Sequence, residues 1–500
     1  MQSAPGPFSP WSRRPGSSCG AETGVTQKAG ASYPHVMPAP ALWLSTLGCA
    51  KNQVDSEKLI AMLSEAGYVW AAGPEEADVV MVNTCAFIEE AREESVDVIL
   101  DLEERKRPGA RSVVIGCMAQ RFGSEVERAL PEVDAVLGID RYGELVGVLD
   151  GLTRWQPVDV RRRPVMDILN ATGRPLSDLP YAYVKVAEGC DKPCTFCAIP
   201  VIRGKQRSRS PVEIREEVDG LVESGVSEVV LVAQDLAAYG RDIGAPGGLP
   251  DLLVFLSDVP GLDRLRLLYL HPREIRERLL VEMTSNQVVT PYFDLSLQHV
   301  SAPLLRKMKR PGNLEKHTAL VTHIRELEPD AALRSSFIVG FPGETHDEVE
   351  DLADFLAAVG LDWAGFFPYS AEPGTPAAEM DGRVPRDETM DRLRYLSAIQ
   401  EEITETRHSD WMGRTDLVLV DQVEDGVPVG RSHRQAPEID GVIRLDEGRV
   451  GEWVEVEYTG VFGPDMEAVQ SSVVGSRSSA RTKAGGFPDT DYREPRTAKP

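Results

Sequence analysis

The chain has 500 residues, of which 42% are hydrophobic and 27% charged, and these values exclude a mostly disordered or collagen-like protein. Its 54 basic and 79 acidic residues give a formal charge of −25, which disfavours nucleic acid as a partner and favours a basic one. No apolar run approaches the roughly 20 residues that span a bilayer, so we expect no membrane association. Seven cysteines are too few for a disulfide scaffold, which favours a reducing, cytoplasmic setting.

Residues 1–40 are rich in Pro, Ser, Gly and Ala, and we predict a disordered extension that includes Cys19 and could precede a true initiator at Met37. The next segment, 41–155, alternates strands with helices, which predicts a parallel α/β domain. The predicted strands are 42–47, 79–82 and 112–115, and the predicted helices are 55–66, 86–102 and 124–130.

Residues 176–408 repeat this alternation over six units, which predicts a partial (βα)6 barrel and not a closed eightfold one. The predicted strands are 183–187, 228–233, 265–270, 292–297, 333–339 and 363–367, and the predicted helices include 211–223, 314–327 and 344–359. Residues 409–470 predict a small, OB-like β-barrel. Its predicted strands are 417–421, 441–444, 453–458 and 461–462. Residues 471–500 predict a disordered tail.

Three cysteines lie on one short segment directly after the first predicted barrel strand. Cys190, Cys194 and Cys197 have the spacing CxxxCxxC. Three thiolates can hold a four-iron cluster and leave one iron open to a small molecule. A structural zinc site needs a fourth ligand, and none lies nearby in the sequence. The pattern therefore favours an iron–sulfur cluster over zinc or unrelated cysteines.

A second set of three cysteines is spread along the first domain. Cys49, Cys85 and Cys117 each follow an apolar predicted strand. Because the carboxyl ends of parallel strands meet at one edge of a sheet, these thiols could converge there. The alternative is that each is an ordinary buried cysteine. Three such residues at the same strand end favour a second three-cysteine cluster.

The sequence segments around all six cysteines resemble those of the methylthiotransferase family of radical S-adenosyl-L-methionine (SAM) enzymes. The segments are LGCAKNQVDSE, VNTCAFIEEAREES, VIGCMAQR, AEGCDKPCTFCAIP, LVAQD, RSSFIVGFPGET and YSAEPGTPA, and the resemblance runs from about 42 to 464. It implies a 4Fe-4S cluster on the CxxxCxxC cysteines that binds SAM, and an auxiliary 4Fe-4S cluster on the other three. One SAM would then provide the methyl group and a second the radical.

The resemblance also implies contacts with SAM. Phe196 lies within the cysteine loop and is expected to flank the adenine. Gln234 and Arg334 lie at or near barrel strands and are weaker candidates. Arg334 enters its strand and could equally form a salt bridge.

The family modifies either an adenosine of tRNA or the β-carbon of an aspartate in ribosomal protein S12. Residues 411–466, named the TRAM domain in this family, hold 5 Arg, no Lys and 12 Asp or Glu, a net charge of 5 − 12 = −7. This charge opposes tRNA binding and favours S12 as the partner, through the acidic TRAM domain. The segment APEIDG also resembles the S12 branch. One departure from the family pattern lies at Leu236-Ala237-Ala238-Tyr239. Here Leu236 and Ala237 stand where the resemblance leads us to expect Thr-Thr.

We therefore predict an S12 aspartate methylthiotransferase that also needs an electron donor and a sulfur donor. A tRNA methylthiotransferase is the first alternative. A non-catalytic iron–sulfur protein that scaffolds ribosome assembly is the second.

Overall fold

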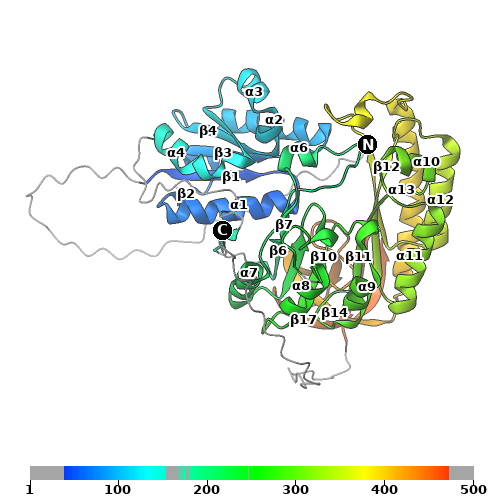
Figure 1. The fold of residues 1–500 in the computed structure, drawn as a ribbon. Coiled ribbons are helices and arrows are strands. Elements are labelled where there is room, and N and C mark those ends of the chain that lie inside the picture. Colours follow the sequence, from blue (N-terminus) through cyan, green and yellow to red (C-terminus); the bar gives the residue numbers. More distant parts are fainter. Residues whose placement is uncertain are drawn as a thin grey trace, which may run out of the picture. The chain divides into compact units, whose positions relative to one another are not determined.

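The computed structural model describes residues 39–153, 168, 170–171, 173–175, 179–245 and 247–471. The predicted extension and tail, with Cys19, lie outside the described residues except for positions 39, 40 and 471. Three successive groups of strands follow one another along the chain (Figure 1). No helix in the described part of the chain is long and apolar enough to cross a membrane.

The first group is a five-stranded parallel sheet with the order β2-β1-β3-β4-β5. Its strands are β1 (Ala41–Thr46), β2 (Val69–Trp70), β3 (Val79–Thr84), β4 (Arg111–Gly116) and β5 (Ala135–Gly138). The strand order changes direction between β1 and β3, so the helices that follow these strands cover opposite faces of the sheet. Figure 1 shows α1 (Ala50–Glu65) on one face, and α2 (Glu89–Arg105) and α3 (Cys117–Ala129) on the other.

The three predicted strands of this sheet are confirmed, but the helices differ from the prediction. α1 begins at Ala50 and not at residue 55. The prediction missed its first turn because the buried side chains there are polar and lack the apolar spacing that indicates a helix. α2 begins at Glu89 and not at residue 86. α3 begins at Cys117 and is kinked at Phe122, so the predicted helix at 124–130 was only its second half. The short strands β2 and β5 and the helix α4 (Leu145–Thr153) were not predicted.

The second group holds six parallel strands in two sheets, ordered β10-β9-β6 and β11-β12-β13. The strands are β6 (Tyr181–Lys185), β9 (Glu228–Val232), β10 (Arg264–Leu267), β11 (Tyr292–Gln298), β12 (Ala332–Val339) and β13 (Trp363–Pro368). Two isolated bridges, Leu265 to Val289 and Leu270 to Leu295, join the sheets. The six strands confirm the predicted partial barrel.

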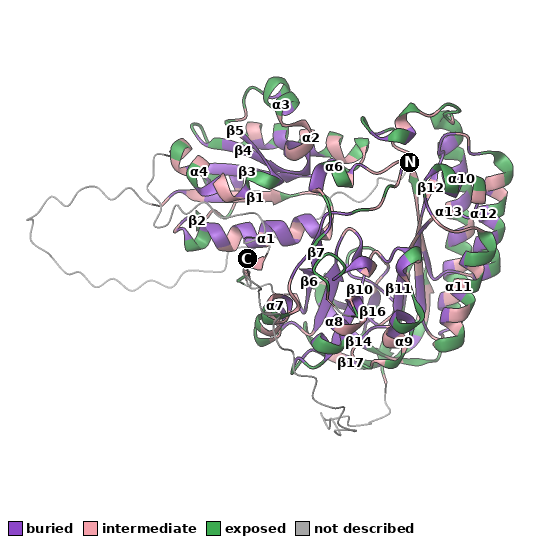
Figure 2. Ribbon diagram, in the orientation of Figure 1, coloured by how far each residue is buried: buried purple, intermediate pink, exposed green. Residues whose placement is uncertain are grey.

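Helices cover the outer face of these strands. They are α7 (Pro211–Glu223), α8 (Leu249–Ser257), α9 (Glu277–Ser285), α11 (Leu314–Leu327), α12 (His346–Val359) and α13 (Arg386–Ser409). The short helix α6 (Ile199–Arg203) packs instead on the core of the first domain, and α10 (Ala302–Lys307) packs in a small cluster with Phe341. α7 and α11 have their predicted bounds, whereas α12 starts two residues later than predicted because Thr345 is its capping residue. Figure 2 shows the strands buried and the outward helix faces exposed.

Strand side chains alternate between the helices and the barrel interior. On β6, Ala182 and Val184 belong to the core that the helices cover, and Tyr181 and Tyr183 belong to a separate interior cluster. A two-residue period of this kind is the geometry of a strand. A short antiparallel pair, β7 (Ala187–Glu188) and β8 (Arg207–Ser208), follows β6.

The third group is a closed five-stranded barrel with the order β14-β15-β16-β18-β17. Its strands are β14 (Thr415–Glu424), β15 (Val427–Arg431), β16 (Ile443–Leu445), β17 (Trp453–Phe462) and β18 (Asp465–Gln470). The barrel confirms the predicted architecture. The segments 453–458 and 461–462 are one strand and not two, because a register shift near Gly460 interrupts the pairing without ending β17.

The loop between β15 and β16 covers the amino ends of the large barrel's strands. Tyr183 donates a hydrogen bond to the carbonyl of Pro437 at 3.0 Å, and Tyr292 donates one to Asp440 at 2.5 Å. Trp363 donates to a carbonyl of the same loop at 2.8 Å. The carboxyl ends of these strands are the end at which barrel enzymes build their sites.

Candidate functional site

Cys49, Cys85 and Cys117 lie at one edge of the first sheet. Cys49 caps α1 after β1, Cys85 directly follows β3, and Cys117 begins α3 after β4. The crevice at the carboxyl ends of β1 and β3 is the point where the strand order changes direction, and ligands bind at such points in open α/β sheets. The structure thus brings the three thiols to the edge that the sequence predicts.

Two glycines allow the loops at this edge to approach one another. Gly48 has a φ of +89°, and a Cβ there would lie 2.9 Å from the sulfur of Cys85. Gly116 has a φ of +98°, and a Cβ there would lie 2.7 Å from the backbone nitrogen of Thr84. Any side chain at either position would clash and would strain the backbone. The two glycines therefore permit the close approach of the cysteine loops.

Asn52 fixes the same loops by hydrogen bonds. Its Nδ2 donates to the carbonyl of Leu47 at 2.9 Å and to that of Thr84 at 3.1 Å. The backbone carbonyl of Asn52 accepts a hydrogen bond from Nδ2 of Asn83 at 3.0 Å. The ends of β1 and β3 are therefore held together through one buried side chain.

The thiols of this set differ in their ionisation. Burial raises the pKa of Cys49, but the positive charges of Lys51 and Arg203 outweigh this effect, so that the pKa is lowered from its ordinary value. Burial raises the pKa of Cys85 to about 12, and the neighbouring Cys117 and Cys49 add to the effect. The pKa of Cys117 is also raised by burial. The three groups are close enough to influence one another's charge.

The loop with Cys190, Cys194 and Cys197 runs from β7 to α6. Gly189 has a φ of +79°, and a Cβ there would lie 2.2 Å from the carbonyl oxygen of Lys205. The backbone N–H of Cys190 donates to the carbonyl of Gly204 at 3.1 Å, which closes the base of the loop. The N–H of Lys192 donates to the sulfur of Cys190 at 3.4 Å.

Burial keeps two thiols of this loop protonated when no metal is bound. It raises the pKa of Cys190 to about 11 and that of Cys197 to about 12. Arg310 points its Nη1 at the sulfur of Cys194, at 3.7 Å. Thiolates are the ligands of iron–sulfur clusters, so binding must displace these protons.

Both thiol sets have a donor chemistry that fits an iron–sulfur cluster. Among the described residues, no three His, Cys, Asp or Glu side chains gather closely enough to hold one metal ion. In a cluster each thiolate binds a different iron, so the sulfur atoms need not converge on one point. The cations Lys51 and Arg203 beside the first set, and Arg310 beside the second, suit an anionic cluster.

The three predicted SAM-contact residues lie in different surroundings. Phe196 is half-buried against the cluster of Leu304, Met308 and Phe341. Gln234 follows β9, and its Nε2 donates to Glu188 at 3.0 Å. Arg334 lies near the amino end of β12, where it forms ion pairs with carboxylates at 3.0 and 3.3 Å. For Arg334 the structure supports the salt-bridge alternative.

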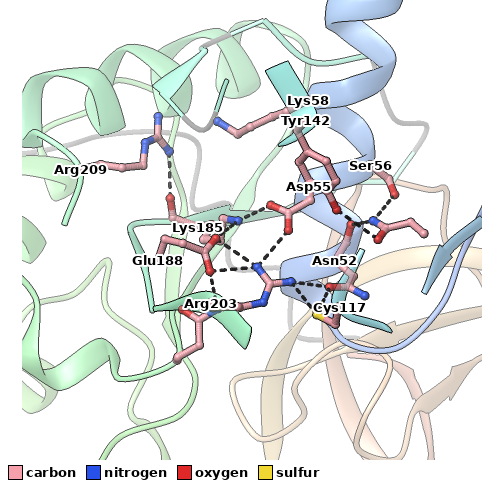
Figure 3. A network of polar contacts seen from close by, with 12 residues as sticks. Asn52, Asp55, Ser56, Lys58, Cys117, Tyr142, Lys185, Glu188, Arg203 and Arg209 are labelled. Carbon is pink, nitrogen blue, oxygen red and sulfur yellow. Dashed lines mark hydrogen bonds and ion pairs between the residues drawn. The ribbon is translucent and has the colours of Figure 1, made fainter. Parts of the chain in front are cut away.

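A buried polar network joins the two cysteine-bearing domains, and the sequence did not predict it (Figure 3). Its centre is Arg203, the last residue of α6, which contacts Asp55 of α1 and Glu188 of β7. Lys185 also binds both carboxylates. Ionisable residues at this depth are rare unless paired. The only signal in the sequence was an arginine shortly after the CxxxCxxC segment.

Comparisons with known proteins agree with this organisation. The chain matches Uncharacterized protein family UPF0004 over residues 41–138, the Radical SAM superfamily over 184–356 and the TRAM domain over 412–470. It is 40% identical over 471 residues to the ribosomal protein uS12 methylthiotransferase RimO of Saccharopolyspora erythraea, covering 88% of this chain and 97% of that protein. The enzyme of the same name from Cutibacterium acnes is 41% identical over 85% of this chain and 97% of its own length. The one from Moorella thermoacetica is 40% identical over 83% and 96%.

Proposed function

This chain belongs to the family of ribosomal protein uS12 methylthiotransferases, and we propose that it transfers a methylthio group to the β-carbon of an aspartate in uS12. The observation that carries the proposal is the arrangement of the six described cysteines as two sets of three, one at the carboxyl ends of the parallel strands β1, β3 and β4 and one on the loop between β7 and α6. Two such sets provide two clusters, each with one iron free of protein ligands.

We assign Cys190, Cys194 and Cys197 to the cluster that binds SAM. When bound, SAM and the two clusters supply the radical that removes hydrogen from the substrate carbon and the methylthio group that replaces it. The chain's own part is to shape the loop. Lys192 anchors it by an ion pair with Asp235 at 3.1 Å and a further ion pair with Glu274.

Gln234 and Phe196 are the proposed SAM contacts. The Oε1 of Gln234 is buried and has no hydrogen-bond partner among the described residues. Such an acceptor suits an N–H group of a ligand, since a buried polar atom without a partner is costly. Phe196 offers an apolar ring within the cysteine loop, which suits the face of an adenine.

We assign the auxiliary cluster to Cys49, Cys85 and Cys117. The cations Lys51 and Arg203 lower the pKa of Cys49, so this thiol loses its proton more easily than an ordinary cysteine, which favours the first metal–sulfur bond. Lys51 is 8% exposed, and its Nζ lies 3.4 Å from the centroid of the Tyr269 ring, near the carboxyl end of β10. The auxiliary set therefore faces the large barrel.

Charge on the C-terminal barrel supports a basic protein as the substrate. Its exposed carboxylates are Asp425, Glu438, Asp446, Glu447, Glu452, Glu455, Glu457 and Glu467. The exposed arginines are Arg414, Arg444 and Arg449, whereas Arg431 and Arg434 are buried. The solvent-facing surface is thus acidic, which attracts a basic ribosomal protein and repels the phosphates of tRNA. The reaction also needs an electron donor and a sulfur donor as partners. Because the proposed substrate is a ribosomal protein, we place the reaction in the cytoplasm.

A competition experiment tests the substrate. The anaerobically reconstituted chain is mixed with reductant, a sulfide source, SAM labelled in its methyl group, and equal amounts of uS12 and bulk tRNA. We expect the label in uS12 and not in tRNA. Label in the tRNA would overturn the proposed substrate and keep the chemistry. Bound iron without any cleavage of SAM would instead favour a non-catalytic scaffold.

A further inference from the structure

We propose that Arg203 is a positioning residue that holds the auxiliary cysteines against the SAM-binding loop and raises the reduction potential of the auxiliary cluster. The inference rests on the proposed function, because it takes Cys49, Cys85 and Cys117 as cluster ligands. Arg203 belongs to the other half of the site, since α6 directly follows the CxxxCxxC loop.

The guanidinium of Arg203 contacts both halves at once (Figure 3). Its Nη2 donates to the sulfur of Cys117 at 3.3 Å and to Oδ1 of Asn52 at 2.5 Å. Its Nη1 donates to Asp55 at 3.1 Å and to Glu188 at 2.9 Å. One planar group therefore links a predicted cluster ligand, the residue that ties β1 to β3, and a strand of the SAM domain.

Paired charges fix the orientation of this guanidinium. The side chain of Arg203 is 2% exposed, and those of Asp55 and Glu188 are 0% and 1% exposed. Lys185 completes a set of two cations and two carboxylates. Because Nη1 is held by the carboxylates, Nη2 can point only toward Cys117 and Asn52. A lysine carries the same charge but lacks the rigid fork.

A hydrogen bond from a cation to a ligand sulfur stabilises the more negative, reduced state of a cluster. Hydrogen bonds to the sulfurs and burial are among the features that set iron–sulfur potentials. Arg203 supplies both a donor and a charge at Cys117. Its removal should lower the potential of the auxiliary cluster and leave the other cluster unaffected, since no contact joins Arg203 to the sulfur of Cys190, Cys194 or Cys197 among the described residues.

The test measures the auxiliary cluster alone, in the full-length chain that carries Cys190→Ala, Cys194→Ala and Cys197→Ala. In this background, Arg203→Lys, Arg203→Gln and the double variant Arg203→Gln/Asp55→Asn are compared by redox titration followed by electron paramagnetic resonance. The double variant removes one positive and one negative charge, so the net charge near the cluster stays the same. A change in the reduction potential of its auxiliary cluster therefore reports the lost hydrogen bond. It also avoids an unpaired buried carboxylate, which would destabilise the fold.

Arg209 provides a matched control. Its side chain is 1% exposed and pairs with Glu217 at 2.6 Å, but it contacts no thiol among the described residues. We expect the midpoint potential to fall from the parent to Arg203→Lys and further to Arg203→Gln, to fall also in the double variant, and to stay unchanged in Arg209→Gln.

An unchanged potential in both Arg203→Gln and the double variant, with the cluster intact, would overturn the inference. Loss of the cluster in the double variant, while Arg209→Gln keeps it, would support the positioning role. A parent chain that binds no auxiliary cluster although Arg203 is present would contradict the proposed function itself.

Discussion

Arg334 of β12 and Asp440 of the C-terminal barrel form a buried ion pair, with Nε and Oδ1 3.3 Å apart. Asp440 also accepts hydrogen bonds from the hydroxyl of Tyr292 at 2.5 Å and from the backbone N–H of Ala436 at 2.8 Å. One carboxylate thus connects two barrel strands to the loop between β15 and β16. The C-terminal barrel is an integral support of the large barrel at its amino end.

Replacing Asp440 should loosen this support. Asp440→Ala leaves the hydroxyl of Tyr292 without its acceptor and leaves Arg334 with Asp294 as its remaining ion-pair partner. Removing the partner of a buried polar group costs about 2 kcal/mol. We expect the free energy of unfolding, measured in urea, to fall by that amount. Asp440→Asn keeps the hydrogen bonds and should lose less. The control is Arg449→Ala, whose side chain is 92% exposed, and it should change nothing. Equal stabilities for Asp440→Ala and the parent would contradict this role.

The two thiol sets should load iron independently. The reconstituted parent chain should contain about eight irons, and Cys85→Ala and Cys194→Ala should each contain about four. Because only one set serves SAM, Cys85→Ala should still cleave SAM, whereas Cys194→Ala should not. Iron and sulfide analysis, with chromatographic detection of the cleaved nucleoside, checks both points. Cys19→Ala is the control and should behave as the parent does. Loss of SAM cleavage in a fully folded Cys85→Ala would speak against separate roles.

Lys58 should make stability depend on pH. It forms an ion pair with Glu217 at 2.8 Å, in a cluster with Arg174 and Arg209. Burial lowers the pKa of Lys58 to about 7, because the two arginines offset much of the opposing effect of Glu217. Between that value and the ordinary value of 10.5, the unfolded chain holds one proton more than the folded chain. The free energy of unfolding should therefore rise with pH in this window, by up to about 1.4 kcal/mol per pH unit.

Lys58→Met removes this proton-binding difference. The free energy of unfolding of the parent minus that of Lys58→Met should increase steadily from pH 7 to pH 10 in urea titrations. The subtraction cancels the contributions of other titrating groups. A difference that stays flat or decreases with pH would show that Lys58 keeps its ordinary pKa in the folded chain.

The acidic face of the C-terminal barrel should govern binding to uS12. The triple variant Glu455→Lys, Glu457→Lys and Glu467→Lys reverses three exposed charges on β17 and β18. We expect about a tenfold weaker affinity at low salt, and a smaller difference at high salt where charges are screened. A matched control reverses three exposed charges of α2: Glu93→Lys, Glu94→Lys and Asp97→Lys. Equal weakening by both variants would implicate only the net charge of the chain.

The positions of the six cysteines were predictable because they depend on rules that act locally. Runs such as Val79–Thr84 are buried and β-branched, so they indicate parallel strands, and parallel strands put the residues after them at one edge. The six strands of the large barrel follow from the same pattern. The closed C-terminal barrel follows from short, glycine-punctuated strands, although β15 and β18 were missed because their alternation is brief.

Contacts between distant segments were not predictable. Arg203 lies 86 residues from Cys117, and no periodicity marks an arginine that will be buried between two domains. Arg334 shows the same limit, since its partner Asp440 lies in another domain and only the fold decides between a ligand contact and a salt bridge. The first turn of α1 was missed because Lys51 and Asn52 are polar yet buried. Buried polar networks are determined by tertiary packing, and the sequence pattern records only their apolar surroundings.

Peptide mass spectrometry of uS12 tests the central claim most directly. uS12 is treated anaerobically with the reconstituted chain, reductant, SAM and a sulfide source, and parallel mixtures contain Cys85→Ala or Cys194→Ala. We predict a methylthio mass gain on a single aspartate with the parent chain and no gain with either variant. A gain that persists in either variant, or no gain on uS12 while tRNA in the same mixture acquires a methylthio group, would contradict the account.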